Sequence, residues 1–468
     1  MPRRNVLWIT LESFRWDHTG FGDHVRDTTS NLEDLVSGGA FCSNNCYSHG
    51  IYTRSSTASI LTGRPPSNHG VGMYRTQIPE SISTIPEQLS REGYWNVCIS
   101  PNGHISQATS LNRGFHEFRF ITGSTIRSQV PYSVMGKYLL NLFEHSGGLT
   151  TDTSHHSISY LNNKLAKGYI DRAATRDDSM FLYLHYGDSH HPYIPPVAWR
   201  DTFEEELALS LDEAVDLASY MKSNLLEEIA QGCSFHSDEW NDLLVLYDTL
   251  LAYVDHMVGR LIAYAKDVLE NPIIVITGDH GENFGEQGLL GHRLKVTRPL
   301  VHVPMVVDGL EIPAEADDLL QHADIWRSIS KDIEVDLTLP GAVDQAEKSR
   351  KFAVAQMGGD RCEQNLDEIM EYNPDFDRSR FFESDMTALI TDSYIYHRSD
   401  RRIELGFHRG SGDSKEVDDP EIESRFDSWY REWIENVGAP IQTLSEDDDR
   451  EIDQHVRDNL ENMGYLVE

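Results

Sequence analysis

The chain has 468 residues, 39% of them hydrophobic, which is enough to bury a large core and a smaller one beside it. It carries 76 Asp and Glu against 40 Lys and Arg, only ten of them Lys, for a formal net charge of −36. This balance argues against a nucleic acid or an anionic membrane as a partner. The acidic residues are spread along the chain, a pattern typical of halophilic proteins that stay hydrated in concentrated salt.

The five cysteines are odd in number and irregularly spaced, so they indicate neither a disulfide framework nor a paired metal motif. Two arginines precede an apolar run near the start, but that run is about seven residues long and ends at Glu12, too short for a secretory signal. No stretch reaches the roughly 18 apolar residues of a membrane span. We therefore expect a soluble cytoplasmic protein, and the sequence does not indicate its oligomeric state.

The first part of the chain alternates short apolar strands with helices. Strands are predicted at residues 5–11, 95–100, 180–186, 273–277 and 303–307, and helices at 31–36, 83–91 and 243–268. This alternation predicts an α/β fold, with a large, mostly parallel sheet between helices. In such sheets, sites form beyond the C-terminal ends of the strands.

The pattern changes after about residue 310. A hairpin of antiparallel strands is predicted at 386–398 and 402–408, and helices at 424–436 and 452–463. The sequence therefore predicts a catalytic α/β domain over residues 1–310 and a smaller α+β domain over 311–468.

Three of the predicted strands end in a carboxylate or an imidazole. Glu12 follows the first strand, Asp188 and His190 follow the third, and Asp279 and His280 follow the fourth. Asp and His supply the oxygen and nitrogen ligands that suit zinc, manganese and other divalent ions. Taken singly, Glu12 could be a solvated loop acid and His190 a hydrogen-bonded structural residue.

A segment rich in hydroxyl groups begins at Thr53 and ends at Thr62-Gly63-Arg64. Ser and Thr at the start of a helix are commonly no more than N-caps. Beside a metal ion, however, the Thr53 hydroxyl would be a plausible nucleophile, because the metal lowers its pKa and the helix N-terminus favours an anionic substrate.

Several motifs occur in a fixed order along the chain. They read NVLWITLESFR at the first strand, LTGR after the hydroxyl-rich segment, DSHHPY, TGDHGENFGEQGLLGH, HVPM and a terminal LENMGY. In this order and spacing the chain resembles the sulfatases of the alkaline-phosphatase superfamily. The resemblance implies an alkaline phosphatase-like fold and a metal-dependent hydrolase of sulfate or phosphate esters.

The resemblance also implies roles for individual residues. Thr53 lies nine residues before Thr62, in the place of the family's modified Cys or Ser nucleophile. His190 and His292 match histidines that contact the substrate or its leaving group. One divalent ion (Ca, Mg, Mn or Zn) is expected on a set of four residues: Glu12, Thr53, Asp279 and His280.

The chain departs from the family pattern at three places. Within residues 53–57, Ser55 and Thr57 stand at the positions of the Pro and Arg that direct formylglycine formation. Thr53 cannot become the aldehyde, so no formylglycine is expected. Ser13 stands where the family has a second carboxylate ligand. Asn102 and His104 stand near the usual sulfate-binding Lys-x-His pair, and with Lys295 they are the expected substrate contacts.

These residues predict that Thr53 attacks sulfur or phosphorus in line and that His292 or His190 protonates the leaving oxygen. The expected substrate is an anionic ester of a small molecule, a glycan or a lipid head group. A phosphodiesterase or phosphoglycerol-type transferase stays open as an alternative, as does a second metal on Asp188, His190 and His292. A non-catalytic binding protein with the sulfatase fold is the remaining alternative.

Overall fold

The computed structural model describes residues 3–73, 75–150, 152, 155–408 and 414–438. The predicted helix at 452–463 and the terminal LENMGY motif lie outside the described residues. In the part of the chain that is described, no helix is both long and apolar enough to cross a membrane.

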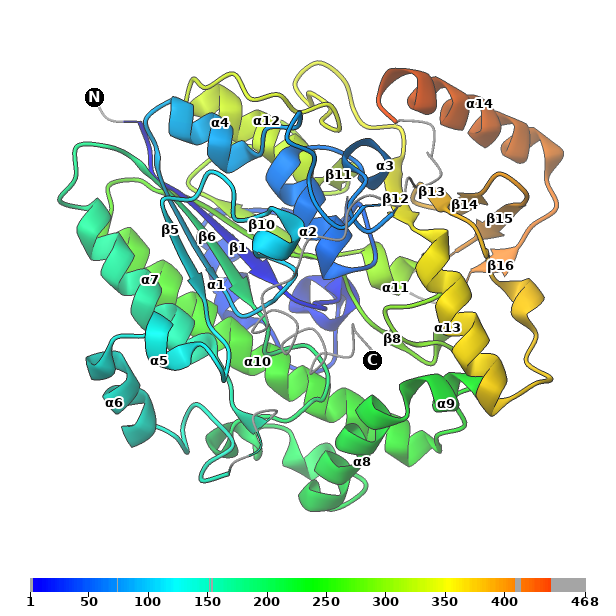
Figure 1. The fold of residues 1–468 in the computed structure, drawn as a ribbon, viewed down its shortest axis with the longest axis horizontal. Coiled ribbons are helices and arrows are strands. Elements are labelled where there is room, and N and C mark those ends of the chain that lie inside the picture. Colours follow the sequence, from blue (N-terminus) through cyan, green and yellow to red (C-terminus); the bar gives the residue numbers. More distant parts are fainter. Residues whose placement is uncertain (1–2, 74, 151, 153–154, 409–413, 439–468) are drawn as a thin grey trace.

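A seven-stranded sheet forms the centre of the molecule (Figure 1). Its strands are β1 (Val6–Leu11), β2 (Phe41–Ser43), β4 (Trp95–Ser100), β5 (Glu117–Phe120), β6 (Met180–Tyr186), β7 (Ile273–Gly278) and β10 (Met305–Asp308). They lie in the order β2-β10-β7-β1-β6-β4-β5. The run from β7 to β5 is parallel, while β10 is antiparallel to both β7 and β2. The predicted α/β fold with a mostly parallel sheet is confirmed.

Helices cover both faces of this sheet (Figure 1). Alternate residues of β1 point to opposite sides: Leu7 and Ile9 enter one apolar cluster, and Val6 and Trp8 enter the other. The first cluster is closed by α1 (Ser30–Ser37), α7 (Ser159–Ala173) and α10 (Ser237–Val268). The second is closed by α2 (Thr53–Thr62), α4 (Ile85–Arg91) and α12 (His322–Asp332).

Shorter elements fill the connections between these layers. The helices are α3 (Pro66–His69), α5 (Ile126–Gln129), α6 (Tyr132–Leu140), α8 (Leu211–Ser223), α9 (Leu225–Ala230) and α11 (Arg298–Val301). The strands are β3 (Cys46–Tyr47) paired with β11 (Leu320–Gln321), and β8 (Asn283–Phe284) paired with β9 (Leu290–Gly291).

A five-stranded antiparallel sheet forms a smaller lobe. It contains β12 (Ala353–Met357), β13 (Met386–Ile390), β14 (Tyr394–Arg398), β15 (Ile403–Phe407) and β16 (Lys415–Glu416), with α13 (Gly359–Tyr372) and α14 (Pro420–Asn436) beside it. The predicted first strand of the hairpin, 386–398, is two strands. The Thr391 hydroxyl accepts a hydrogen bond from the Tyr394 amide (3.1 Å) and closes a turn there.

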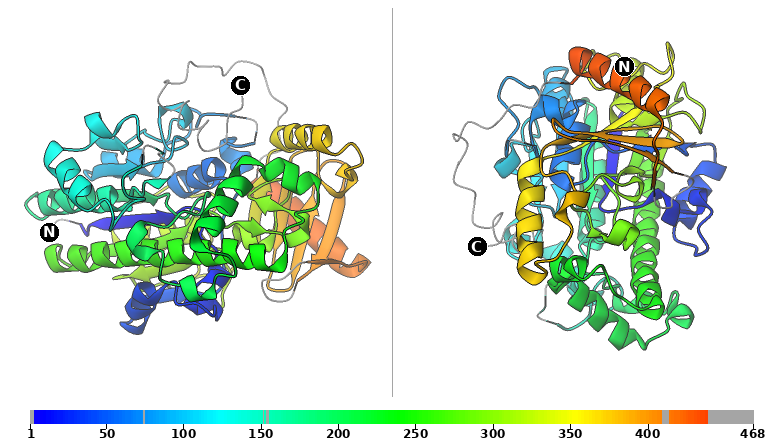
Figure 2. Two further views of the ribbon diagram at one scale, coloured as in Figure 1. Left: turned by 90° about the horizontal axis from the view of Figure 1, so that it is seen from below. Right: turned by 90° about the vertical axis from the view of Figure 1, so that its right-hand side faces the viewer.

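The two lobes share one apolar cluster, because residues of β12 and α13 join the residues of α7 and α10 in it. Residues just beyond the predicted boundary at 310 also pack on the large sheet: the Trp326 ring of α12 stacks on Trp8 with centroids 4.8 Å apart. Figure 2 shows the small sheet at the end of the molecule toward which β1 runs. The C-terminal ends of the parallel strands therefore face the smaller lobe.

Candidate active site

The predicted site residues of β1, β6 and β7 lie at one edge of the sheet because these three strands are neighbours in register. Leu11 pairs with Tyr186 of β6 and with Gly278 of β7. The residues that follow, Glu12 and Asp279, are therefore carried to the same place, and both are buried.

Thr53 is the first residue of α2 and is fully buried. The N-cap is Tyr52, and the Thr53 hydroxyl is not used as a cap. Instead it donates a hydrogen bond to Glu12 Oε1 (3.1 Å) and lies 3.2 Å from His280 Nε2. The helix N-terminus also directs its partial positive charge toward this hydroxyl.

Glu12 is held as a carboxylate at the centre of this group. Its Oε1 accepts a hydrogen bond from Asn102 Nδ2 (2.5 Å), and its Oε2 lies 3.1 Å from His185 Nε2. Burial alone would raise the pKa of Glu12, but the His185 hydrogen bond and the charges of His185, His190 and His280 lower it to about 2.

Asp279 and His280 complete the group. Asp279 Oδ1 accepts hydrogen bonds from the backbone amides of Ser13 (3.2 Å) and His280 (2.8 Å). Asp279 Oδ2 is buried and has no hydrogen-bond partner among the described residues. The His280 Nδ1 nitrogen is occupied by the Gly281 carbonyl (2.7 Å), which turns Nε2 toward Thr53.

These residues fit the divalent ion that the family resemblance implies. A buried carboxylate oxygen without a donor is costly in an apolar interior, and a cation would satisfy it. Asp279 Oδ2 lies 3.7 Å from His280 Nε2, which in turn lies 3.2 Å from Thr53 Oγ1. Ligand atoms bound to one cation at about 2.0–2.3 Å stand at such separations.

The two predicted catalytic histidines lie beside this group. The ring centroids of His280 and His292 are 4.5 Å apart, and those of His190 and His292 are 5.4 Å apart. His190 Nδ1 lies 2.8 Å from the His191 carbonyl oxygen, and His292 Nδ1 lies 2.9 Å from Glu282 Oε1. In each ring the Nδ1 atom has a fixed partner, which sets how the ring is turned.

Glu282 is a buried carboxyl group that the sequence did not single out. Its Oε2 accepts a hydrogen bond from the Tyr193 hydroxyl (3.3 Å). Burial raises its pKa to about 7, although the charges of His190 and His280 act against the shift. Burial also lowers the pKa of His292 well below its usual range, and the charges of His280 and His190 lower it further.

The three predicted substrate contacts do not lie together. Asn102 contacts Glu12, and its Oδ1 accepts a hydrogen bond from the His104 amide (2.9 Å), so both are at the site. Lys295 instead forms an ion pair with Glu404 Oε2 of β15 (2.8 Å) and lines a separate cavity with residues of the small lobe. The structure therefore does not bring Lys295 to Thr53.

The sequence did not predict two cationic side chains that act on the site, those of Arg54 and Arg361. Burial lowers the pKa of His104 well below its usual range, and the charges of Arg54 and Arg361 lower it further, so both guanidinium groups act on the site. Arg361 Cζ lies 5.1 Å from the Tyr52 ring centroid. Arg361 belongs to α13, far from the motifs, and no spacing rule connects it to Thr53.

A cavity of about 700 Å³ opens beside Glu12. Its polar lining includes Asn102, Thr122, His156, Asp188, His190 and Lys222. The cavity is roomy enough for a substrate considerably larger than one sulfate or phosphate group.

Asp188 lines this cavity but acts as a cap for α7. Its Oδ1 accepts a hydrogen bond from the Ile158 amide (2.9 Å), and its Oδ2 accepts one from the Ser159 amide (2.9 Å). The hydroxyl groups of Ser157 and Ser159 also donate to Oδ2. With its oxygens occupied in this way, Asp188 is a structural clamp at the cavity wall.

The Asp188→Ala variant is expected to lower the free energy of unfolding by about 2–3 kcal/mol, because several donors lose a charged acceptor. Urea unfolding followed by circular dichroism measures this. The control is Asp152→Ala, an exposed carboxylate on the same cavity, with an expected change below about 0.5 kcal/mol. If Asp188→Ala instead lost a bound metal ion while its free energy of unfolding did not change, the structural role of Asp188 would be wrong.

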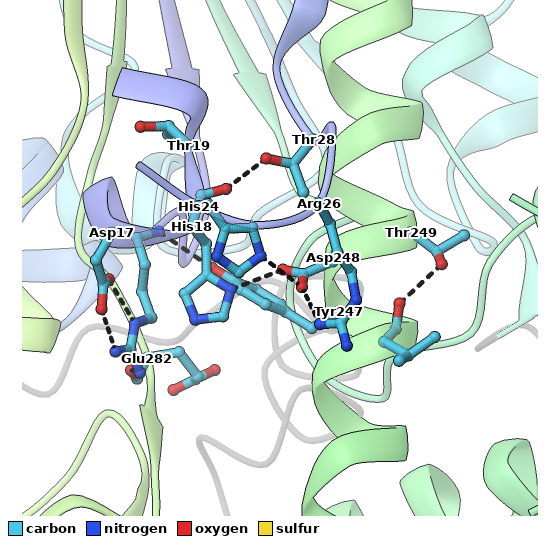
Figure 3. A network of polar contacts seen from close by, with 12 residues as sticks. Asp17, His18, Thr19, His24, Arg26, Thr28, Tyr247, Asp248, Thr249 and Glu282 are labelled. Carbon is cyan, nitrogen blue, oxygen red and sulfur yellow. Dashed lines mark hydrogen bonds and ion pairs between the residues drawn. The ribbon is translucent and has the colours of Figure 1, made fainter. Parts of the chain in front are cut away.

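A buried polar network holds the segment after β1 in place (Figure 3). The Tyr247 hydroxyl of α10 donates to the Ser13 carbonyl (2.7 Å) and accepts from the Arg15 amide (3.1 Å). The next residue of α10 is Asp248. Its carboxylate contacts His18 Nδ1 (2.6 Å) and His24 Nε2 (2.8 Å) and accepts a hydrogen bond from Arg26 Nη1 (2.7 Å). This network fixes the backbone that presents Glu12.

Known proteins are similar to this chain in sequence or in fold. A sulfatase of Formosa agariphila is 24% identical over 318 residues, which are 62% of this chain and 61% of the relative. The uncharacterized sulfatase YidJ of Escherichia coli is 21% identical over 355 residues, 73% of this chain and 70% of that one. The chain thus spans about six to seven tenths of the length of these relatives.

Among solved structures, a phosphonate monoester hydrolase from Silicibacter pomeroyi superposes with a TM-score of 0.69 at 18% identity. The superposition covers 95% of this chain and 97% of that enzyme, and it shows a shared fold. The model of the Sulfatase family matches residues 4–331, which include Glu12, Thr53, Asp279 and His280. The chain therefore belongs to the Sulfatase family of hydrolases.

Proposed function

We propose that this protein hydrolyses sulfate or phosphate esters with Thr53 as its nucleophile. The observation that carries the proposal is the position of the Thr53 hydroxyl, buried at the start of α2 between Glu12 Oε1 (3.1 Å) and His280 Nε2 (3.2 Å). A hydroxyl that only stabilised the fold would not need a carboxylate, an imidazole and a helix N-terminus around it.

The residues that would hold a divalent ion are Glu12, Asp279, His280 and Thr53 itself. When bound, such an ion lowers the pKa of a coordinated hydroxyl and neutralises charge on the substrate. The carboxylate of Glu12 accepts the hydrogen bond of the Thr53 hydroxyl, which orients the oxygen for attack.

In the first step, the Thr53 hydroxyl gives up its proton to solvent, and Oγ1 forms a bond to sulfur or phosphorus as the bond to the ester oxygen breaks. The leaving oxygen takes a proton from His190, one of the two imidazoles beside the nucleophile, because burial lowers the pKa of the other, His292, and makes it a poor proton donor. Water then attacks the sulfur or phosphorus and gives one proton back to the imidazole that acted as the acid. The bond to Thr53 breaks, and the Thr53 oxygen regains a proton from solvent.

An amide and two positive groups around the nucleophile would hold the oxygens of the substrate. Asn102 contacts Glu12, and the charges of Arg54 and Arg361 reach His104 at the same site. A chain with a net charge of −36 needs such a local cluster to attract an anion. The group beyond the ester would occupy the cavity of about 700 Å³ beside Glu12, which would accommodate part of a glycan or a lipid head group.

The experiment is a substrate panel measured at high salt, because the acidic, Lys-poor composition supports an enzyme that works in the cytoplasm of a halophilic cell. An aryl sulfate, an aryl phosphate, an aryl phosphonate and an aryl phosphodiester are compared with a chelator and with added Mn²⁺, Zn²⁺, Mg²⁺ or Ca²⁺. We expect turnover of at least one ester, its loss with the chelator and its return with metal. No turnover under any of these conditions would instead favour a protein that binds anions without catalysis.

A further inference from the structure

His185 is a buried histidine that neither the motifs nor the proposed mechanism uses. It lies in β6, where it pairs with Thr10 of β1, two residues before Glu12. The side chain is fully buried, and its Nε2 lies 3.1 Å from Glu12 Oε2. In the described part of the chain, His185 Nδ1 has no hydrogen-bond partner.

We propose that His185 is a ligand of the divalent ion, together with Glu12 and Asp279. The inference rests on the proposed function, since it adds a ligand to the cation site of Thr53. His185 would supply the ligand that is missing at Ser13, where the chain lacks the second carboxylate of the sulfatase motif.

Three observations support this assignment. Glu12, His185 and Asp279 each offer one ligand atom, and these atoms all lie within 4.8 Å of one another. All three side chains are buried, and Asp279 Oδ2 has no hydrogen-bond partner among the described residues, so a cation placed there would satisfy it. The contact with Glu12 is the one hydrogen bond of the His185 ring in the described residues, so moving the ring onto a shared cation would break no other.

Ser13 does not offer an equivalent ligand. Its backbone has a left-handed conformation (φ 53°), and its amide is used by Asp279 Oδ1. Its hydroxyl carries no negative charge that could replace a carboxylate.

A metal site that includes His185 and His280 contains two imidazole nitrogens as well as the carboxylates of Glu12 and Asp279. Calcium and magnesium prefer an all-oxygen set, whereas mixed nitrogen and oxygen ligands favour zinc, manganese and related transition metals. The ligand chemistry therefore points to a transition-metal dication, with zinc as the first ion to test.

The test is X-ray absorption spectroscopy of the full chain loaded with Zn²⁺, which counts the imidazoles bound to the metal. We expect two imidazoles in the wild type, one in His185→Asn, and two in the control His69→Asn, a buried histidine of α3 that belongs to none of the candidate ligand groups of the described residues. Equilibrium dialysis against mixed Zn²⁺ and Mg²⁺ gives a second reading. There, His185→Asn is expected to lower the preference for zinc at least tenfold.

A single imidazole in the wild type, unchanged in His185→Asn, would overturn the role of His185 and leave the Thr53 nucleophile intact. If the wild type bound no divalent ion at all, both the His185 ligand and the proposed metal site would be wrong. Circular dichroism first verifies that each variant is folded. If His185→Asn does not fold, the imidazole count of the wild type alone decides.

Discussion

The Thr53→Ala variant is expected to lower kcat by about 10³-fold or more on every ester that the wild type turns over, because it removes the hydroxyl proposed to form the covalent bond. The fold should not change, since the side chain loses one methyl and one hydroxyl group at the start of α2. Steady-state kinetics on the panel and a thermal unfolding curve measure the two effects.

The matched variant is Thr53→Ser, which keeps the hydroxyl near Glu12 and His280 and should retain measurable turnover. Quenching the wild type during turnover and digesting it should locate a phosphoryl or sulfuryl group on the peptide that contains Thr53. Turnover in Thr53→Ala equal to that of the wild type would remove Thr53 from the mechanism, whatever the substrate.

The Asp248→Asn variant is expected to lower the free energy of unfolding by about 3 kcal/mol at neutral pH, because it leaves Arg26 and two histidines without their buried carboxylate. Burial alone would raise the pKa of Asp248, but hydrogen bonds from His18 and His24 and their charges hold it far below its usual value of 3.8. Urea unfolding of both proteins at several pH values measures the loss.

The sign of the pH dependence follows from this lowered pKa. An acid whose pKa is lower in the folded state contributes stability above its unfolded pKa of 3.8, and this contribution is lost as the pH falls further. The difference between the wild type and Asp248→Asn should therefore be largest at neutral pH and should shrink below pH 3.8. A difference that does not change with pH would mean that the charge of Asp248 is not what stabilises the network.

Asp255, two turns further along α10, is the control for this experiment. Its carboxylate accepts hydrogen bonds from the backbone amides of Asn31 (2.9 Å) and Leu32 (3.0 Å), and among the described residues it forms no ion pair. Burial raises its pKa to about 6, so its contribution to stability falls as the pH rises from 3.8 to about 6. Asp255→Asn should therefore show the opposite slope to Asp248→Asn.

Much of the large sheet could be predicted because its central strands are buried on both faces and read as continuous apolar runs. The direction of β10 could not be predicted, since the run 303–307 is equally apolar in either orientation. The segment 386–398 was predicted as one strand, but it forms two strands joined by a turn. The turn at Thr391 lies inside a segment whose flanks are both strand-like, and its hydrogen bond to Tyr394 becomes evident only in three dimensions.

The positions of Glu12, Asp279 and His280 followed from one rule, that parallel strands end at a common edge. His185 escaped that rule because it is a single polar position inside the apolar run of β6 and precedes the strand end. Lys295 was predicted as a substrate contact, yet its ammonium group pairs with Glu404 of the other lobe. Arg361 reaches the site from that lobe, and only tertiary packing brings it near Tyr52.

The packing of Arg361 on Tyr52 bears on how this chain could be shortened or recombined. A graft that joined residues 1–310 to the C-terminal part of a distant relative would replace α13, and with it a cation next to the nucleophile. It would also cut the shared apolar cluster and the hydrogen bond from the Gln356 amide of β12 to the His49 carbonyl (2.9 Å). Chimeras that exchange one lobe are therefore expected to lose activity, because the C-terminal lobe supplies a cation and packing contacts to the active site.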